Sequence, residues 1–298
     1  MRVGWVIEVF YLVPGLLASS GVDGRSPSMR CKGRGMQAPG TGNTTRGATI
    51  TIDPALDGRA MAAAFKAHGR IHIPGFLAPH SAAALHDALA AETMWVCSTR
   101  GGGQNIDIPV EHFDAFTPQQ AARFFSLAHA EARDGFHYMF DSLRVSDLIE
   151  KGESIHPALA AGYAFLNSPA FLDFVRALTG DERPNHVDAQ ATRFEAGHYL
   201  TQHDDKKPEA GRLYAYVLNL TPRWRTDWGG LLTFIDEDGH LAEAYAPAWN
   251  ALNLFRVPAE HAVSFVTPFA GAPRLSITGW VRHLPSDSPH RRASARRP

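Results

Sequence analysis

The sequence predicts an α+β protein with one main domain, in which a helical N-terminal half supports an antiparallel β-sandwich, jelly roll or barrel. Stretches with helical periodicity end before residue 181, and short β-rich segments fill the sequence that follows. The chain shows neither strand–helix alternation nor a Gly-rich phosphate loop. A nucleotide-binding α/β fold is therefore not expected.

Four segments before residue 181 have the composition and spacing of helices. Thr117 is the expected N-cap of one helix, with Pro118 at its first position, and Ser168 and Gly180 are expected to bound another. The four segments are PALDGRAMAAAFKAHG, PHSAAALHDALAAE, TPQQAARFFSLAHAEARDGF and SPAFLDFVRALTG.

Seven segments after residue 181 are rich in β-forming residues and are separated by Gly, Pro, Asp or polar turns. They are HVDAQATRF, RLYAYVLNLT, GLLTFID, HLAEAYA, WNALNLFRV, HAVSFVT and RLSITGWVR. Two further extended segments, ATITID and IHIPGFL, precede them, and residues 98–108 are interpreted as a loop. This number and spacing of strands is typical of a sandwich or barrel.

The composition excludes some classes of function. A formal net charge of −1 gives no large electrostatic footprint for nucleic acid, so no nucleic-acid partner is expected. The cysteines Cys31 and Cys97 cannot form a disulfide framework, which fits a reducing compartment and predicts a cytoplasmic protein.

The two ends of the chain differ from the rest. Residues 1–47 combine an apolar run from Val9 to Ala18 with a Gly-, Ser- and Arg-rich stretch, and that run is too short to span a bilayer. We interpret them as a disordered leader or an over-long start, with Met29 or Met36 as the first residue; an export signal is the alternative. Residues 48–284 are expected to form a single domain with a β-rich core at about 186–283, followed by a disordered basic tail at 285–298.

The stretch HYLTQHDDKK contains the strongest candidate site. In extended backbone the side chains alternate between two faces, so His203 and Asp205 are expected to share one face while Asp204 points outward, toward Lys206 or Lys207. His261, at the start of a later strand, can supply a second imidazole. Two histidines and one carboxylate form a facial set that suits Fe(II), although zinc accepts the same ligands.

Each element of this pattern has a simpler interpretation when taken alone. An HDD triplet beside KK is more often an exposed polar loop, and a single histidine at a strand start is more often structural. Arg274 opens a later strand, where an arginine is usually a surface charge. The order of these residues along the chain, together with the sequence around them, favours a metal and ligand site.

The segments RFEAGHYLTQHDD, YVLNLTPRW, WGGLLTF, PAWNALNLFRVPAEHAV and RLSITGWVR resemble those of the Fe(II)- and 2-oxoglutarate-dependent dioxygenases. They are similar to the prolyl 4-hydroxylase-like branch, and especially to the catalytic domain of ribosomal-protein prolyl hydroxylases. The resemblance is strongest from about residue 188 to 283. It implies a double-stranded β-helix, which is a cupin-like jelly roll.

By this resemblance, His203, Asp205 and His261 would be the iron ligands, and Arg274 would bind the distal carboxylate of 2-oxoglutarate. Ser276 and Thr278 share the strand face of Arg274 and are further candidates for co-substrate binding. The remaining pocket candidates are the tyrosines Tyr199, Tyr214 and Tyr216.

One position departs from the resembled branch. A tyrosine that often helps bind the co-substrate, about nine residues before the first ligand, is replaced here by Phe194, which we interpret as ordinary core packing. The missing phenol leaves more of the co-substrate binding to Arg274 and Ser276.

The resemblance implies an oxidoreductase that consumes Fe(II)-bound O2 and 2-oxoglutarate, releases succinate and CO2, and hydroxylates an unactivated C–H bond. The expected substrate is a prolyl residue of a protein or peptide, and L-ascorbate (vitamin C) is an expected auxiliary. One alternative is hydroxylation of a small molecule, such as a free amino acid. Another is a cupin-like metal-binding module without redox activity, which Arg274 and Ser276 argue against because such a module needs no placed guanidinium.

Overall fold

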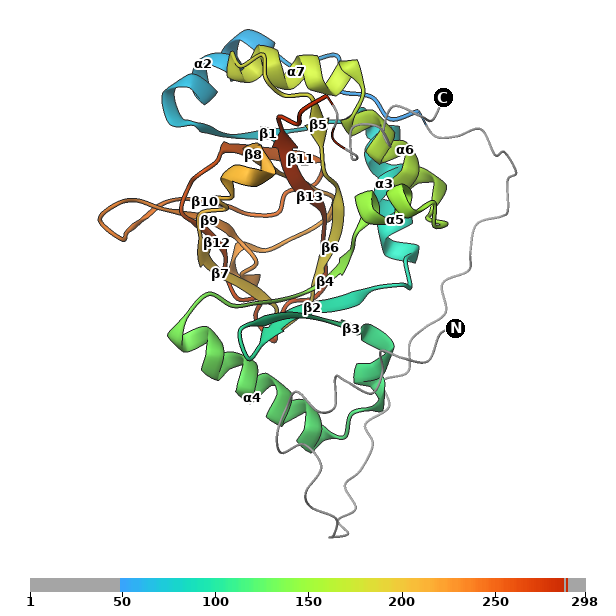
Figure 1. Ribbon diagram of the computed structural model, residues 1–298, viewed down its shortest axis with the longest axis vertical. Coiled ribbons are helices and arrows are strands. Elements are labelled where there is room, and N and C mark those ends of the chain that lie inside the picture. The colour runs from blue at the N-terminus through green and yellow to red at the C-terminus, as the bar shows by residue number, and fades with distance from the viewer. Residues whose placement is uncertain (1–48, 287, 289–298) are drawn as a thin grey trace. The chain divides into compact units, whose positions relative to one another are not determined.

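The computed structural model describes residues 49–286 and 288, so the expected leader and most of the expected basic tail lie outside the described residues. Thirteen strands of this described part form one antiparallel sheet that curls into a barrel (Figure 1). Their hydrogen-bonded order is β1-β11-β8-β13-β6-β4-β7-β12-β9-β10, with β2, β3 and β5 attached beside this path. The predicted jelly-roll class with a helical layer is confirmed.

Nine strands come from the β-rich half of the sequence, and four precede it. The early strands are β1 (Arg70–Pro74), β2 (Val96–Gly101), β3 (Gln104–Pro109) and β4 (Tyr138–Leu143). The later strands are β5 (His186–Val187), β6 (Gln190–Phe194), β7 (Tyr199–His203), β8 (Arg212–Asn219), β9 (Leu232–Ile235), β10 (Leu241–Tyr245), β11 (Ala251–Arg256), β12 (His261–Val263) and β13 (Arg274–Arg282).

Side chains bridge the gap between the first and last strands of this path. Arg70 on β1 forms an ion pair with Glu243 on β10, with 2.8 Å between Nε and Oε2. The rings of His72 and Tyr245 lie beside them, with their centroids 5.3 Å apart. The barrel is therefore nearly closed.

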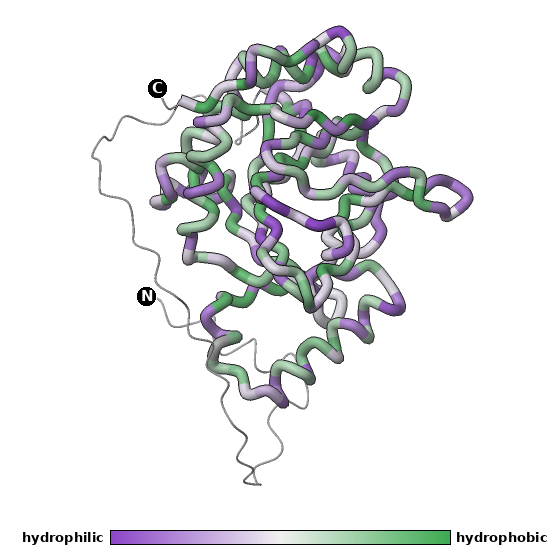
Figure 2. Tube along the Cα trace, turned by 180° about the vertical axis from the view of Figure 1, so that it is seen from behind, coloured by the Kyte–Doolittle hydropathy of each residue, from purple (hydrophilic) through white to green (hydrophobic). Residues whose placement is uncertain are grey.

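The turn between β9 and β10, residues 236–240, projects from the barrel and is hydrophilic at its tip (Figure 2).

Six α-helices surround the barrel in the described part of the chain. α2 packs against α7 at one end, α3, α5 and α6 cover one side, and α4 crosses the opposite end (Figure 1). Their bounds are α2 (Gly58–His68), α3 (Pro79–Ala91), α4 (Pro118–Asp134), α5 (Val145–Lys151), α6 (Pro157–Leu166) and α7 (Pro169–Thr179), with short 3-10 turns η1 (Val110–Ala115), η2 (Pro208–Ala210) and η3 (Thr226–Trp228).

Alternation along β8 separates the helical layer from the barrel interior. Tyr214 and Tyr216 point into the apolar core beneath the helices, whereas Ala215 and Val217 join a smaller cluster inside the barrel. This is the period of two expected for a strand that is buried on both faces. The helical layer therefore supports one wall of the barrel and leaves the interior available for a site.

Local signals predicted most helix ends correctly. Thr117 caps α4 in a reciprocal capping box with Gln120, and Gly180 ends α7 at φ 70°. Ser168 does not cap α7 through its side chain, because its hydroxyl donates to the carbonyl of Phe165 at 2.7 Å instead.

Two local predictions were wrong. The segment ATITID forms only an isolated bridge, from Ile52 to Leu77, and residues 98–108 are a hairpin rather than a loop. The polar, Gly-rich sequence of that hairpin gives no strand signal. The hairpin is stabilised because β2 also pairs with β4 on the edge away from β3. Tertiary pairing thus overrides weak local propensity.

None of the helices in the described part of the chain has, by itself, the length and apolar composition needed to cross a membrane. The pair α6 and α7 reaches that length and composition only when the two helices are joined across a 45° bend.

Candidate active site

The barrel interior holds a cavity of about 150 Å³. It is lined by His203, Asp205 and His261 and by Arg274, Ser276 and Thr278 on β13. Its other walls are mainly apolar and include Leu200, Leu232, Val263, Phe140 and Phe194. The cavity therefore brings together all six residues that the sequence analysis singled out for metal and co-substrate binding.

The two histidines face each other across paired strands. His203 ends β7 and His261 begins β12, and the two are direct partners in the ladder, with ring centroids 4.1 Å apart. The Asp205 carboxylate completes the group: its Oδ1 lies 3.7 Å from Nε2 of His203, and its Oδ2 lies 3.6 Å from Nε2 of His261. One potential ligand atom from each residue lies within 4.8 Å of the other two, a spacing that can hold a metal ion.

Backbone carbonyls determine which ring nitrogen of each histidine is free. Nδ1 of His203 lies 2.9 Å from the carbonyl of Thr201, and Nδ1 of His261 lies 2.7 Å from that of Ala259. A carbonyl only accepts, so each Nδ1 carries the hydrogen and each Nε2 presents a lone pair toward Asp205. Burial, and then the proximity of His203, lower the pKa of His261 to about 4, which keeps that ring neutral.

Asp205 reaches the histidines by a route that strand parity did not predict. β7 ends at His203, and Asp205 has a φ of 60°, so it lies outside the extended backbone that the parity argument assumed. A left-handed turn, which aspartate tolerates better than most residues, directs its carboxylate back toward His203. The carboxylate of Asp204 points toward Lys206, but it accepts the backbone N–H of that residue at 2.9 Å and does not pair with its ammonium group.

Arg274 is a buried cation without a carboxylate partner. Its side chain is 2% exposed, and among the described residues no carboxylate lies within ion-pair distance of it. Its Nε has no hydrogen-bond partner there, and its guanidinium carbon lies 5.0 Å from the ring centroid of Phe194. Burial lowers the pKa of Arg274 to about 10. A buried charge of this kind is costly until an anion pairs with it, so the cavity is suited to an anionic ligand.

The residues next to Arg274 on its strand face also reach the cavity. The hydroxyl of Ser276 lies 2.7 Å from that of Thr192, and the hydroxyl of Thr278 donates to the carbonyl of Tyr216 at 2.7 Å. Phe194 is buried, as the packing interpretation requires, but it also forms part of the cavity wall and stacks on Phe140 at 5.0 Å.

The three candidate tyrosines lie in different surroundings. Tyr199 packs beneath α4, where its hydroxyl lies 2.9 Å from Nδ1 of His137. Tyr214 faces the helical layer and donates to Asp181, so neither Tyr199 nor Tyr214 lines the cavity. Tyr216 contributes to the cavity wall, but its side chain also belongs to the core beneath the helices and its hydroxyl donates to a backbone carbonyl.

Sequence reasoning missed three residues at the site. Trp280 lines the cavity on the same face of β13 as Arg274, so extending the parity argument along that strand would have found it. Arg212 stacks on the indole of Trp280, and nothing in its local sequence predicts that contact. Phe136 is 42% exposed, and its ring centroid lies 5.3 Å from that of His203.

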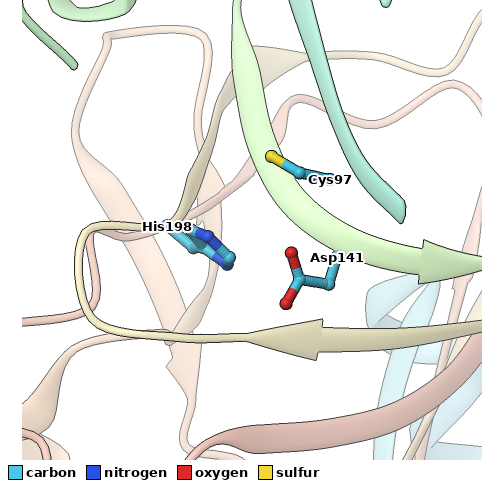
Figure 3. A group of neighbouring side chains, drawn as sticks. All are labelled: Cys97, Asp141 and His198. Carbon is cyan, nitrogen blue, oxygen red and sulfur yellow. The ribbon is translucent and has the colours of Figure 1, made fainter. Parts of the chain in front are cut away.

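A second group of potential metal ligands lies outside the cavity (Figure 3). Cys97 on β2, Asp141 on β4 and His198, just before β7, are buried and point toward one another. Nδ1 of His198 accepts the N–H of Glu195 at 3.0 Å, so the ring hydrogen is on Nε2 and neither nitrogen is free for a metal. Burial and Asp141 raise the pKa of the Cys97 thiol, which keeps it protonated.

The Asp141 carboxylate in this group already has a cation. Nε of Arg193 donates to its Oδ2 at 2.9 Å, and Nη2 forms an ion pair with the same oxygen at 2.8 Å. We therefore interpret the group of Cys97, Asp141 and His198 as a buried polar network that joins β2, β4 and β6.

Asp141→Ala is expected to lower the free energy of unfolding by about 3 kcal/mol, because the largely buried guanidinium of Arg193 loses its short, hydrogen-bonded partner and keeps only the Glu195 carboxylate at 3.4 Å. Urea denaturation measures this loss. The number of Co2+ ions bound per chain should equal that of the unchanged protein. Loss of one bound ion per chain in this variant would identify the group as a metal site instead.

Comparisons with known proteins match the part of the chain that carries the candidate site. Residues 189–282 match the model of the 2OG-Fe(II) oxygenase superfamily. The chain is 30% identical over 200 residues to the prolyl 3-hydroxylase OGFOD1 of Mus musculus, which covers 62% of this chain and 36% of that protein. It is also 30% identical over 128 residues to OGFOD1 of Xenopus laevis, which covers 41% of this chain and 24% of that protein. The chain thus spans about a third or less of the length of these relatives.

Solved structures share the fold. A 2OG-Fe(II) oxygenase family oxidoreductase from Burkholderia pseudomallei superposes with a TM-score of 0.51 at 14% identity, covering 80% of this chain and 96% of that one. A prolyl hydroxylase from Trichoplax adhaerens, solved with a hypoxia inducible factor peptide, has a TM-score of 0.50 at 14% identity, covering 76% and 89%. Residues 189–282 therefore resemble the 2OG-Fe(II) oxygenase superfamily, and the described part of the chain shares the fold of these solved structures.

Proposed function

We propose that this protein is an Fe(II)- and 2-oxoglutarate-dependent dioxygenase that hydroxylates a prolyl residue of a protein or peptide. The observation that carries the proposal is the position of two complementary groups in one cavity. Three potential metal ligands converge at one part of its wall, and at another lies a buried guanidinium that has no carboxylate partner among the described residues. The first group suits a divalent metal and the second suits a carboxylate.

The proposed metal ligands are His203, Asp205 and His261. Two Nε2 lone pairs and one carboxylate match the facial set of non-haem Fe(II) oxygenases, which leaves coordination positions open. Both rings are oriented by their Nδ1–H bonds to backbone carbonyls, so little rearrangement is needed to bind an ion. When bound, iron and 2-oxoglutarate supply the activation of O2, with succinate and CO2 as co-products.

The proposed role of Arg274 is to bind the distal carboxylate of 2-oxoglutarate. A planar guanidinium can donate two parallel hydrogen bonds to a carboxylate, and its burial makes that pairing strong. Ser276 and Thr278 offer hydroxyls on the same strand face, although each already has one polar partner. Phe194 lies against the guanidinium where a phenol would provide a further donor, so Arg274 supplies the charge-assisted bonds.

The apolar cavity walls limit the access of water to the reacting atoms. Leu232 and Phe255 are buried beside the histidines, and Val263 and Leu200 line the same space. Excluding water protects a reactive oxidant from side reactions and strengthens the electrostatic interactions inside the cavity. A hydrophobic substrate group such as a pyrrolidine ring is compatible with these walls.

The substrate class is proposed from the likeness to the OGFOD1 prolyl 3-hydroxylases, which extends over 62% of this chain. A cytoplasmic location is proposed from the low cysteine content, and the use of L-ascorbate as an auxiliary reductant is proposed from the resemblance of the sequence to the prolyl hydroxylase branch.

The test of this function is mass spectrometry of proteins from cells with and without the gene. We expect a gain of one oxygen atom on specific prolines, which is absent when the gene is replaced by its His203→Ala variant. Stoichiometric succinate formation in vitro should accompany it. If succinate forms only with free amino acids or other small molecules, and no protein gains oxygen, the prolyl substrate is excluded while the oxygenase chemistry stands.

A further inference from the structure

The carboxylate of Asp205 is carried by a short segment that has little regular structure. Residues 204–211 link β7 to β8, and the only regular structure in them is the 3-10 turn η2. Asp205 has a φ of 60° in this segment, and a left-handed conformation costs a residue with a side chain about 1 kcal/mol. A contact from outside the segment can add to its internal bonds, such as that from the N–H of Lys206 to Asp204, in holding the carboxylate where His203 and His261 can share an ion with it.

Arg212, the first residue of β8, contacts Asp205 at two points. Its Nη1 donates to the backbone carbonyl of Asp205 at 3.2 Å and lies 3.6 Å from the carboxylate Oδ1. A contact to the carbonyl opposes rotation of the peptide group, and a contact to the carboxylate opposes rotation of the side chain. One guanidinium thus restrains both the backbone and the side chain of the same residue.

The guanidinium of Arg212 is itself held in place. Its carbon lies 3.4 Å from the ring centroid of Trp280, a close cation–π contact, and its side chain is only 18% exposed. Trp280 lies on β13, so this stack connects the Asp205 segment to the strand that carries Arg274.

We propose that Arg212 is a positioning residue that sets the metal affinity of the site by holding Asp205 in its left-handed conformation. The inference rests on the proposed metal centre. Arg212 is not a ligand, since a guanidinium remains protonated, and its effect is transmitted through Asp205. In the absence of Arg212, Asp205 would sample other conformations, and the two histidines would hold an ion without a fixed carboxylate.

Arg282 provides a matched control. Arg282 lies on β13 and, like Arg212, is a largely buried arginine that contacts the segment 204–211. It does so at the other end of the segment, where its Nε donates to the carbonyl of Ala210 at 2.6 Å. Its second partner is Asp188, and neither contact involves Asp205. Replacing Arg282 therefore loosens the segment without releasing the carboxylate directly.

The experiment measures the dissociation constant for Co2+ by calorimetry on metal-free protein, without 2-oxoglutarate. Arg212→Met is expected to weaken Co2+ binding about 10- to 100-fold, the range typical of residues that orient metal ligands. Arg212→Lys keeps the positive charge but loses the planar guanidinium with its several N–H donors. Its dissociation constant for Co2+ should lie between those of Arg212→Met and the unchanged protein. Arg212→Lys also keeps the test available if Arg212→Met does not fold. Arg282→Met should change the constant less than about threefold.

Three results would overturn the inference. An unchanged Co2+ constant in a folded Arg212→Met protein would show that Asp205 does not depend on Arg212. Equal weakening in Arg282→Met would show that general anchoring of the segment is responsible. Tight Co2+ binding that survives His203→Ala would overturn the proposed metal centre itself, which separates that failure from a failure of the Arg212 role.

Discussion

Replacing Asp205 with alanine is expected to weaken Co2+ binding at least about 100-fold and to abolish succinate formation, because it removes one of three proposed ligands. Asp204→Ala should leave both quantities within about threefold of the unchanged protein. The two residues are adjacent and chemically identical, yet only the Asp205 carboxylate lies 3.6–3.7 Å from both imidazoles. The Asp204 carboxylate instead accepts the N–H of Lys206.

Calorimetry with Co2+ and a succinate assay measure the two variants side by side. His203→Ala and His261→Ala should match Asp205→Ala, which tests the three ligands as one set. The opposite pattern, with an inactive Asp204 variant and an active Asp205 variant, would show that the other aspartate supplies the ligand.

Arg274→Met is expected to separate stability from co-substrate binding. It should weaken 2-oxoglutarate binding by about 100-fold or more, since truncating one partner of a buried charge pair costs about 2–5 kcal/mol. The same change should raise the free energy of unfolding of the ligand-free protein by about 1 kcal/mol, because it removes a cation that is 2% exposed and lacks a carboxylate partner among the described residues.

Titration of 2-oxoglutarate into Co2+-loaded protein, together with urea denaturation, measures both effects. Arg274→Lys keeps a cation but loses the fork, so it should bind 2-oxoglutarate weakly without the gain in stability. Co2+ affinity should be unchanged in both variants. A loss of stability in Arg274→Met would mean that packing against Phe194 outweighs the cost of the buried charge.

Parity arguments succeeded where the residues lie in long, paired strands. Arg274, Ser276 and Thr278 reach the cavity together because β13 runs unbroken from Arg274 to Arg282 and is paired on both edges. Trp280 follows from the same rule. Asp205 does not, because β7 ends two residues earlier and the carboxylate arrives through a turn with positive φ. The sequence analysis therefore named His203 and Asp205 correctly as neighbours, but its reason, the alternation of side chains along a strand, does not apply to Asp205.

Other features had no usable local signal. The hairpin β2–β3 has a polar, Gly-rich sequence, and its strands exist because β2 pairs with β4 across about 40 intervening residues. Phe136 lies beside His203 because α4 and the start of β4 bring it there. Arg212 contacts Asp205 and stacks on Trp280, which lies 68 residues after Arg212 in the sequence (280 − 212 = 68).

The sequence by itself determined the class of fold, the order of helices and strands in most of the domain, and the residue types of the candidate site. These properties depend on local periodicity and on chemical identity, both of which can be read along the chain. Only the tertiary structure decided which face of each strand encloses the cavity, that Arg274 lacks a carboxylate partner among the described residues, and that Arg212 supports Asp205. Those properties depend on distances between residues that are far apart in sequence, and local patterns do not encode them.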